Sequence, residues 1–254
     1  MSEKVAWYSR GKTGIDSEKQ RRQDSEKPRR FWLPPGKGNN CVFLDDESFN
    51  VYEYNWFANN SWMNWATKSP DADAEAVFRE KGLNPYFCAY RTIVNCTEWE
   101  DKQGKKHNYE LQFLPAKNDT AQLIERRREH HEGLVGKMFT ITRNEGDRTT
   151  SAGDDYVFKK DVDINEMLPY VMYKGNKFID LVNQANEDDE KRAYLTSKFA
   201  VEIVDGVILP KLVPFNYPDL LAPPSPREAK IMLAGASSRA SGKGSGSGDD
   251  DIPF

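Results

Sequence analysis

The chain has 254 residues, of which 38% are hydrophobic and 30% are charged, and its formal net charge is −4. This length suits one large domain or two small ones, and the apolar content of the middle of the chain is enough for a core. No stretch approaches the roughly 20 consecutive apolar residues of a membrane span, and no apolar run of a signal peptide is present. The three cysteines argue against a disulfide framework. These features exclude a membrane protein and a disulfide scaffold, and we expect a cytoplasmic protein.

The charges are distributed unevenly along the chain. Residues 1–40 hold ten Lys or Arg against five Asp or Glu, whereas the last six residues hold three aspartates. A basic segment of this kind is suited to contact phosphates, and a solvated surface helix has the same composition. We expect residues 1–40 to form a basic N-terminal arm.

From residue 41 the pattern is typical of strands. Residues 49–57, FNVYEYNWF, alternate between the two faces of a strand, and a helical segment is predicted over 72–81. The strongest strand signal is the segment 86–99, which is rich in β-branched and aromatic residues. Gly104 marks a hairpin turn, and residues 109–115 are predicted to be the partner strand.

The next segment, NDTAQLIERRREHHEGLVG, predicts a helix that is capped by one of residues 118–120 and ends at Gly133 or Gly136. KMFTITRN and YVFKKDV then predict two more strands. The predicted order of strands, then a helix, then two more strands matches a five-stranded Greek-key barrel of the oligonucleotide-binding (OB) type. Many other α+β domains share this order. We therefore expect a mainly β fold with added helices, in which residues 41–162 form an OB-fold barrel.

The rest of the chain is predicted in three parts. Residues 163–222 are expected to be a mainly helical extension, which is open to two interpretations: a cover on the barrel or a self-association element. Residues 223–248, rich in glycine and serine towards their end, are expected to be a flexible linker. Residues 249–254 are an acidic tip.

Neither a metal site nor catalytic machinery is predicted. No C-x₂-C pair is present, and His130 and His131 on one helix point about 100° apart, so they are poorly placed to bind one ion. We interpret Cys88 and Cys96 as buried small hydrophobic residues, and we expect no metal and no cofactor. No P-loop, G-x-S-x-G, G-x-G-x-x-G or H-E-x-x-H motif occurs, so we predict that the chain is not an enzyme.

Aromatic residues make up 12% of the chain, and several lie beside cations, as in RRFW, AYR and YVFKK. Single-stranded nucleic acid is bound by this pairing, because bases stack on aromatic faces while cations follow the phosphates. Strand parity places Arg91 and Trp99 on one face, which we expect to be the wetter face. A buried core position is the competing interpretation for every aromatic residue. The candidate DNA contacts are Arg91, Trp99, Arg143, Tyr156 and Lys159, with one of Trp62 and Trp65.

The sequence DDDIPF resembles the acidic C-terminal tip of bacterial single-stranded DNA-binding proteins, in which an OB barrel is followed by a disordered linker. All six residues match, and a Gly/Ser-rich segment precedes them. The resemblance implies that the tip binds partner proteins, through a hydrophobic pocket for its apolar residues and cations for its carboxylates. The implied partner-binding residues are Asp249, Asp250, Asp251, Ile252, Pro253 and Phe254.

A second resemblance covers about residues 1–160. The stretches FWLPPGKGNNCVFLDDESFNVYEYNW and YRTIVNCTEW are similar to phage-encoded single-stranded DNA-binding proteins, which also use the OB fold. Many members of that family carry a cysteine-pair zinc motif between these stretches. This chain has SPDADAEA there, so we expect no zinc.

Together the resemblances imply a protein that binds and protects single-stranded DNA without sequence specificity during phage DNA replication, recombination and repair. In the host bacterial cytoplasm, its tip would recruit host or phage replication, recombination and repair proteins. Two alternatives stay open: a single-strand annealing or recombination-mediator protein, and a DNA-processing nuclease that docks through the tip.

Overall fold

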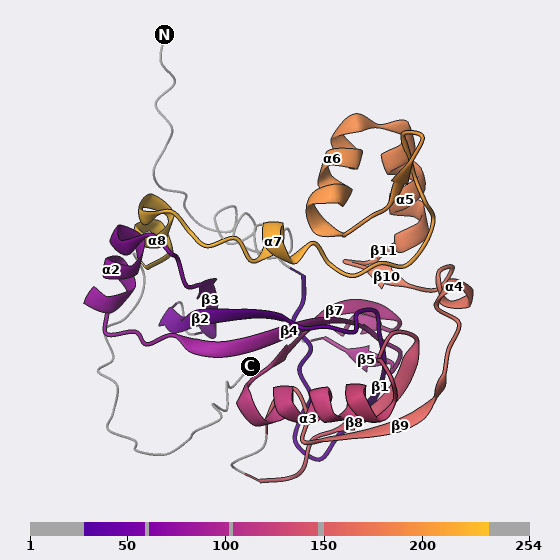
Figure 1. The fold of residues 1–254 in the computed structure, drawn as a ribbon, viewed down its shortest axis with the longest axis horizontal. Helices are drawn as coiled ribbons and strands as arrows, with labels where there is room; N and C mark the ends of the chain where they lie inside the picture. The colour runs from indigo at the N-terminus through magenta and orange to yellow at the C-terminus, as the bar shows by residue number, and fades with distance from the viewer. Residues whose placement is uncertain (1–27, 59–60, 102–103, 147–149, 234–254) are drawn as a thin grey trace.

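The computed structural model describes residues 28–58, 61–101, 104–146 and 150–233 (Figure 1). These residues form a mixed α/β fold with a nine-stranded sheet, two separate two-stranded sheets and seven helices. The acidic tip and the first 27 residues of the expected arm lie outside the described residues. No helix in the described ranges is long and apolar enough to cross a membrane.

The strands and helices are numbered separately in chain order. The strands are β1 (Gly38–Phe43), β2 (Phe49–Ala58), β3 (Ser61–Thr67), β4 (Tyr86–Asn95), β5 (Trp99–Glu100), β6 (Lys106–His107), β7 (Glu110–Ala116), β8 (Lys137–Thr142), β9 (Asp155–Asp161), β10 (Met172–Tyr173), β11 (Asn176–Lys177), β12 (Ile203–Val204) and β13 (Val207–Ile208). The helices are α2 (Ala72–Glu80), α3 (Asn118–His130), α4 (Ile164–Met167), α5 (Phe178–Glu187), α6 (Asp189–Lys198), α7 (Tyr217–Leu220) and α8 (Pro226–Leu233).

The nine-stranded sheet has the order β11-β10-β7-β4-β1-β8-β9, and the β2–β3 hairpin is attached to the first half of β4. The predicted closed five-stranded barrel is not what forms: the sheet is open, because β9 does not return to β7. The outer edge of β7 is occupied instead by β10 and by the segment around Arg30. In that segment the N–H of Phe31 donates to the carbonyl oxygen of Phe113 at 2.6 Å, and the N–H of Phe113 donates to the carbonyl oxygen of Arg29 at 2.8 Å.

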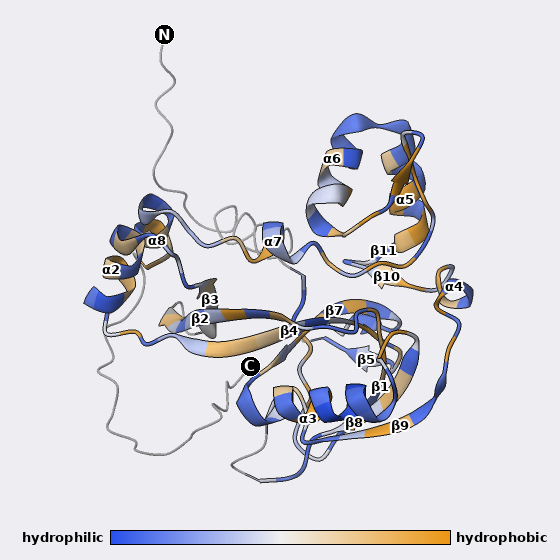
Figure 2. Cartoon of the chain, viewed as in Figure 1, coloured by the Kyte–Doolittle hydropathy of each residue, from blue (hydrophilic) through white to orange (hydrophobic). Residues whose placement is uncertain are grey.

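The two predicted helices are present, but the predicted cap of the second is wrong. Asp71 caps α2, accepting from the N–H groups of Asp73 and Ala74 at 2.8 and 3.2 Å. The N-cap position of α3 is Lys117, whose side chain makes no capping hydrogen bond. Residues 118–120 lie inside α3, which is mostly hydrophilic along its length in Figure 2 and turns only Thr120 and Ile124 fully inward.

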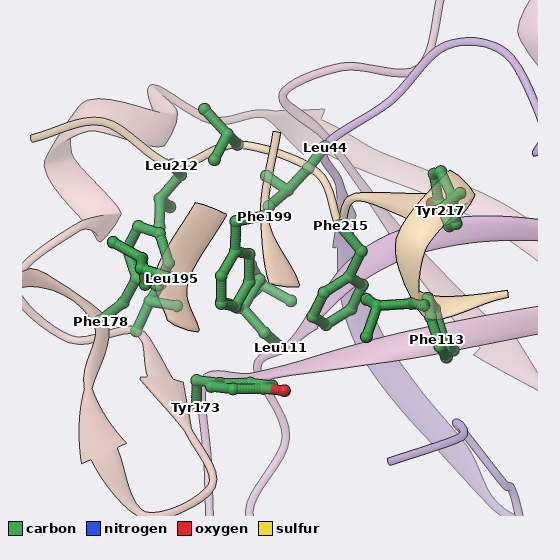
Figure 3. Packing of buried hydrophobic residues seen from close by; sticks show 14 of the residues in the cluster. Leu44, Leu111, Phe113, Tyr173, Phe178, Leu195, Phe199, Leu212, Phe215 and Tyr217 are labelled. Carbon is green, nitrogen blue, oxygen red and sulfur yellow. The ribbon is translucent and has the colours of Figure 1, made fainter. Parts of the chain in front are cut away.

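Three hydrophobic clusters pack against the sheet. The first lies on the inner face of the sheet beneath α3 and includes Phe43, Ile93 and Phe139. The second covers the opposite face of β4 and β7 with residues from 167–221. The third packs the β2–β3 hairpin against α2 and α8. Figure 3 shows the second cluster, in which Phe113 of β7 meets Phe215 and Tyr217 of the covering segment. We call residues 163–221 the C-terminal cover.

Two segment boundaries in the structure differ from those expected from the sequence. Part of the expected basic arm belongs to the fold, because Phe31 and Leu33 are buried in the first cluster. A helix, α8, lies where the flexible linker was expected to begin, because Ala229 and Leu233, one turn apart, are buried in the third cluster with Phe78 of α2.

Candidate nucleic-acid interface

The C-terminal cover removes one face of the central sheet from solvent. Phe215 packs edge-on against Phe113 of β7 with ring centroids 4.7 Å apart, and Tyr217 stacks on Phe49 at 5.3 Å. Bases cannot stack on this part of β4 and β7 while the cover is in place. The accessible aromatic residues of the sheet therefore lie beyond the cover.

A buried polar group fastens the cover to the sheet. The Tyr217 hydroxyl donates to the Asp45 carboxylate, and its oxygen lies 2.8 Å from Oγ1 of Thr92. The same Oγ1 accepts from the N–H of Phe215 at 2.9 Å. Burial raises the pKa of Asp45 to about 6, against the opposing effect of its hydrogen bonds to Tyr217 and Thr92. The cover is therefore held by polar contacts as well as by its aromatic rings.

The β2–β3–β4 ribbon, formed by β2, β3 and the first half of β4, extends beyond the cover (Figure 1). On one of its faces the guanidinium of Arg30 lies 3.9 Å from the centroid of the half-buried Trp65 ring and 5.3 Å from that of Tyr90. Such a geometry is a cation–π contact, favourable by about 0.5–2 kcal/mol. Trp65, one of the two candidate tryptophans in this hairpin, is thus paired with a cation.

Glu53 holds Arg30 in this position. Its carboxylate is fully buried and accepts from Nη2 of Arg30 at 2.6 Å and from the hydroxyls of Tyr86 and Tyr90. Burial and the charge of Glu53 raise the pKa of Tyr86, so its hydroxyl stays protonated and donates. A second cation lies beside this group: Nζ of Lys117 is 4.4 Å from the centroid of the Tyr86 ring.

Trp99 forms a second cation–aromatic group on the β5–β6 hairpin. Its ring stacks on His107 with centroids 4.4 Å apart, and the guanidinium of Arg29 lies 5.3 Å from the ring centroid. Arg29 also lies 3.8 Å from carboxylate oxygens of Asp101 and Glu110. Because Arg29 and Arg30 are consecutive in an extended segment, their side chains diverge and the two tryptophans flank that segment.

Three of the candidate contacts are buried inside the fold. Arg91 is only 1% exposed, and its Nη2 donates to Glu125 of α3 at 2.9 Å. Arg143 donates to the carbonyl oxygen of Leu33 at 3.1 Å, and the Tyr156 hydroxyl donates to the carbonyl oxygen of Ala152 at 2.6 Å. The expectation that the face of Arg91 is the wetter one is wrong, because α3 and the inner cluster cover it. We leave these three residues out of the interface.

The other candidates differ in position. Lys159 is exposed on β9, away from any described aromatic contact of its own. The side chain of Trp62 lies outside the described residues, as does the whole acidic tip. Trp65 and Trp99 are the two candidates that the structure places beside cations.

Sequence reasoning missed the residues that complete these two groups. RRFW was noted as a cation–aromatic stretch, but the partners of Arg29 and Arg30 are distant in sequence: Trp65 is 35 residues from Arg30, and Trp99 is 70 residues from Arg29. Lys117 was outside every motif considered. Only the pairing of residues 29–31 with β7 brings these side chains together.

Of the three cysteines, Cys88 lies within the Arg30 group, on the face of β4 that carries Tyr86 and Tyr90. Cys41 and Cys88 are buried and Cys96 is half-buried, and burial raises the pKa of the Cys96 thiol to about 12. Within the described ranges, no group of three or more His, Cys, Asp or Glu side chains is arranged to hold a metal ion.

Comparison with known proteins gives no further assignment. No protein-family model matches the sequence, no curated protein matches it at a significant level, and no solved structure is significantly similar to the fold.

Proposed function

We propose that this chain binds single-stranded DNA without reading its sequence and keeps it unpaired. The observation that carries the proposal is the pair of arginines, Arg29 and Arg30, each set over a tryptophan on a different hairpin. Base stacking on aromatic rings tolerates any base, since every base has a π-face, while cations elsewhere on the surface attract the phosphates.

The order of the elements supports the proposal. The path β7-β4-β1-β8-β9, with α3 between β7 and β8, has the strand order and helix position of an OB fold. In this interpretation the β2–β3 hairpin and α2 are an insertion between the first two strands. The segment at Arg30 fills the gap between β7 and the β8–β9 hairpin: the N–H of Leu33 donates to the carbonyl oxygen of Ser151, in the loop between β8 and β9, at 2.9 Å. The finer proposal is therefore an OB-type sheet whose last gap is filled by the end of the basic arm.

The sequence of the tip supports a second part of the proposal. Residues 249–254 carry three carboxylates followed by Ile, Pro and Phe, a combination suited to a partner surface with cations around a hydrophobic pocket. We propose that the tip recruits host or phage proteins of replication, recombination and repair while the folded part holds the strand. The setting would be phage DNA metabolism in the bacterial cytoplasm.

Titration of labelled oligothymidines at several salt concentrations tests the DNA-binding part. We expect tight, sequence-independent binding that weakens with salt, and no cleavage in Mg²⁺. Weak binding with rapid pairing of complementary strands would favour the annealing alternative. Cut products would favour the nuclease alternative.

Tryptophan variants locate the interface in the same assay. Trp65→Ala and Trp99→Ala should each weaken binding by roughly 5- to 100-fold, whereas Trp65→Phe, which keeps a stacking ring, should lose less. Tyr170→Ala is the matched control, because Tyr170 is 63% exposed and belongs to the C-terminal cover rather than to either group. Wild-type affinity in both tryptophan variants, with unchanged thermal melts, would remove these groups from the interface.

A further inference from the structure

The reverse face of the β2–β3–β4 ribbon carries a second aromatic group. Tyr52, Tyr54 and Trp56 alternate along β2 and point to the face opposite Trp65, which pairs with Asn55 in the register. Tyr54 and Trp56 are buried against Phe78 of α2. Tyr52 continues this row beyond the edge of α2 and is 55% exposed.

Tyr52 has both an aromatic neighbour and a cation. It lies directly opposite Phe87 in the β2–β4 register, and the two rings meet edge-to-face with centroids 6.0 Å apart. Nζ of Lys68 lies 6.0 Å from the centroid of the Tyr52 ring, and the N–H of Lys68 donates to the carbonyl oxygen of Tyr52 at 2.7 Å. Phe87 therefore supports the ring from one side, and the backbone bond fixes the residue that carries the cation.

Within the described part of the chain, the charge of Lys68 meets the Tyr52 ring but no carboxylate. Lys68 is exposed and has no ion pair among the described residues. Asp71, three residues along the chain, turns its carboxylate to the N–H groups of α2 instead. The exposed ring on β2 and the ammonium group just after β3, held side by side, have the chemistry that binds one nucleotide: a base on the ring and a phosphate at the cation.

We propose that Tyr52 and Lys68 form a second nucleotide-stacking site, so that a bound strand contacts both faces of the β2–β3–β4 ribbon. This inference rests on the proposed function and extends its interface beyond Trp65. A nucleobase fits the site better than a protein does, since Asn50 and Lys68 make its surroundings polar and a stable protein partner needs about 800 Å² on each side. A single base needs only the exposed ring.

A length series of oligothymidines, from roughly 4 to 16 nucleotides, tests the site in the full chain. Tyr52→Ala should bind the shortest oligomers that the wild type binds with unchanged affinity, and the longest roughly 5- to 10-fold more weakly. Tyr52→Phe should behave as the wild type. Lys68→Gln should reduce the slope of log affinity against log salt by about 0.7, the value for one phosphate contact on a single strand. Tyr170→Ala, at a more exposed tyrosine of the C-terminal cover, is the control and should change nothing.

A second measurement does not depend on how the variants fold. Photocrosslinking of the wild type to a long oligomer that contains 5-iodouracil should label Tyr52 itself, which fragment ions distinguish from Trp65 in the tryptic peptide 38–68. Wild-type affinity of Tyr52→Ala for long oligomers, or the absence of crosslinks to Tyr52, would overturn this inference while leaving the proposed function standing. Failure of the wild-type chain to bind any oligomer would refute the proposed function itself.

Discussion

Replacing Glu53 by glutamine tests the reasoning about the Arg30–Trp65 group. The substitution keeps the shape of the side chain and removes its charge, leaving Arg30, 21% exposed, without its carboxylate. Breaking one partner of a buried ion pair costs about 3–5 kcal/mol. Because Arg30 keeps some contact with water, we expect the lower end, about 3 kcal/mol, from this principle. In a chain of this size that corresponds to a fall in Tm of about 6–12 °C.

Urea unfolding followed by far-UV circular dichroism measures this loss. Glu98→Gln is the matched control: Glu98 pairs with Lys106 at 2.8 Å, but both side chains are more than half exposed, so the expected cost is below about 1 kcal/mol. Arg30→Met added to Glu53→Gln should recover part of the loss, since no buried charge then lacks a partner. If Glu53→Gln alone costs less than about 1 kcal/mol, the carboxylate does not hold Arg30 as argued.

Two further predictions concern pH and the tip. Burial raises the pKa of Asp45 from 3.8 to about 6, so the folded chain holds this proton more tightly than the unfolded chain, and the contribution of Asp45 to stability falls as the pH rises through that window. Between pH 5 and 7.5 the wild type should lose about 1.4 kcal/mol more than Asp45→Asn in urea titrations, and parallel curves would contradict the assignment. Deletion of residues 249–254 should leave oligonucleotide binding unchanged or tighter, since it removes negative charge, while abolishing capture of replication, recombination and repair proteins. A markedly weaker deletion variant would count against this role of the tip.

Local sequence signals predicted the elements whose structure is set locally. The β-branched and aromatic run at 86–99 contains β4, the segment 109–115 closely matches β7, and the segment 72–81 closely matches α2. The closed barrel could not be predicted in the same way, because closure depends on which segment reaches the free edge of β7. Residues 29–31, which looked like part of a solvated arm, reach that edge.

The candidate site was predicted only in part for a related reason. Alternation correctly separates the two faces of β4, but it does not say which face is covered. Arg91 lies on the face that α3 covers, and its charge is met there by Glu125, so a residue that looked like a DNA contact is a core residue. Trp65 and Trp99 lie on hairpins at the margin of the sheet, where they meet solvent and two arginines. A cation–aromatic motif in sequence thus predicted the chemistry better than it predicted the partners.

In the proposed complex, different residues stack on the bases and bind the phosphates, because the arginines beside the tryptophans already have carboxylate partners. Arg29 and Arg30 lie next to the carboxylates of Glu110 and Glu53, which are buried, so much of their charge is offset before a strand arrives. In the proposed complex they hold the tryptophan rings, and phosphates are met by other cations, such as Lys68 and the basic residues of the arm. Loss of a tryptophan should therefore lower affinity by the same factor at every salt concentration, whereas loss of Lys68 should change the slope. Measured in one titration, these two behaviours distinguish a stacking surface supported by buried ion pairs from a surface whose arginines bind phosphate directly.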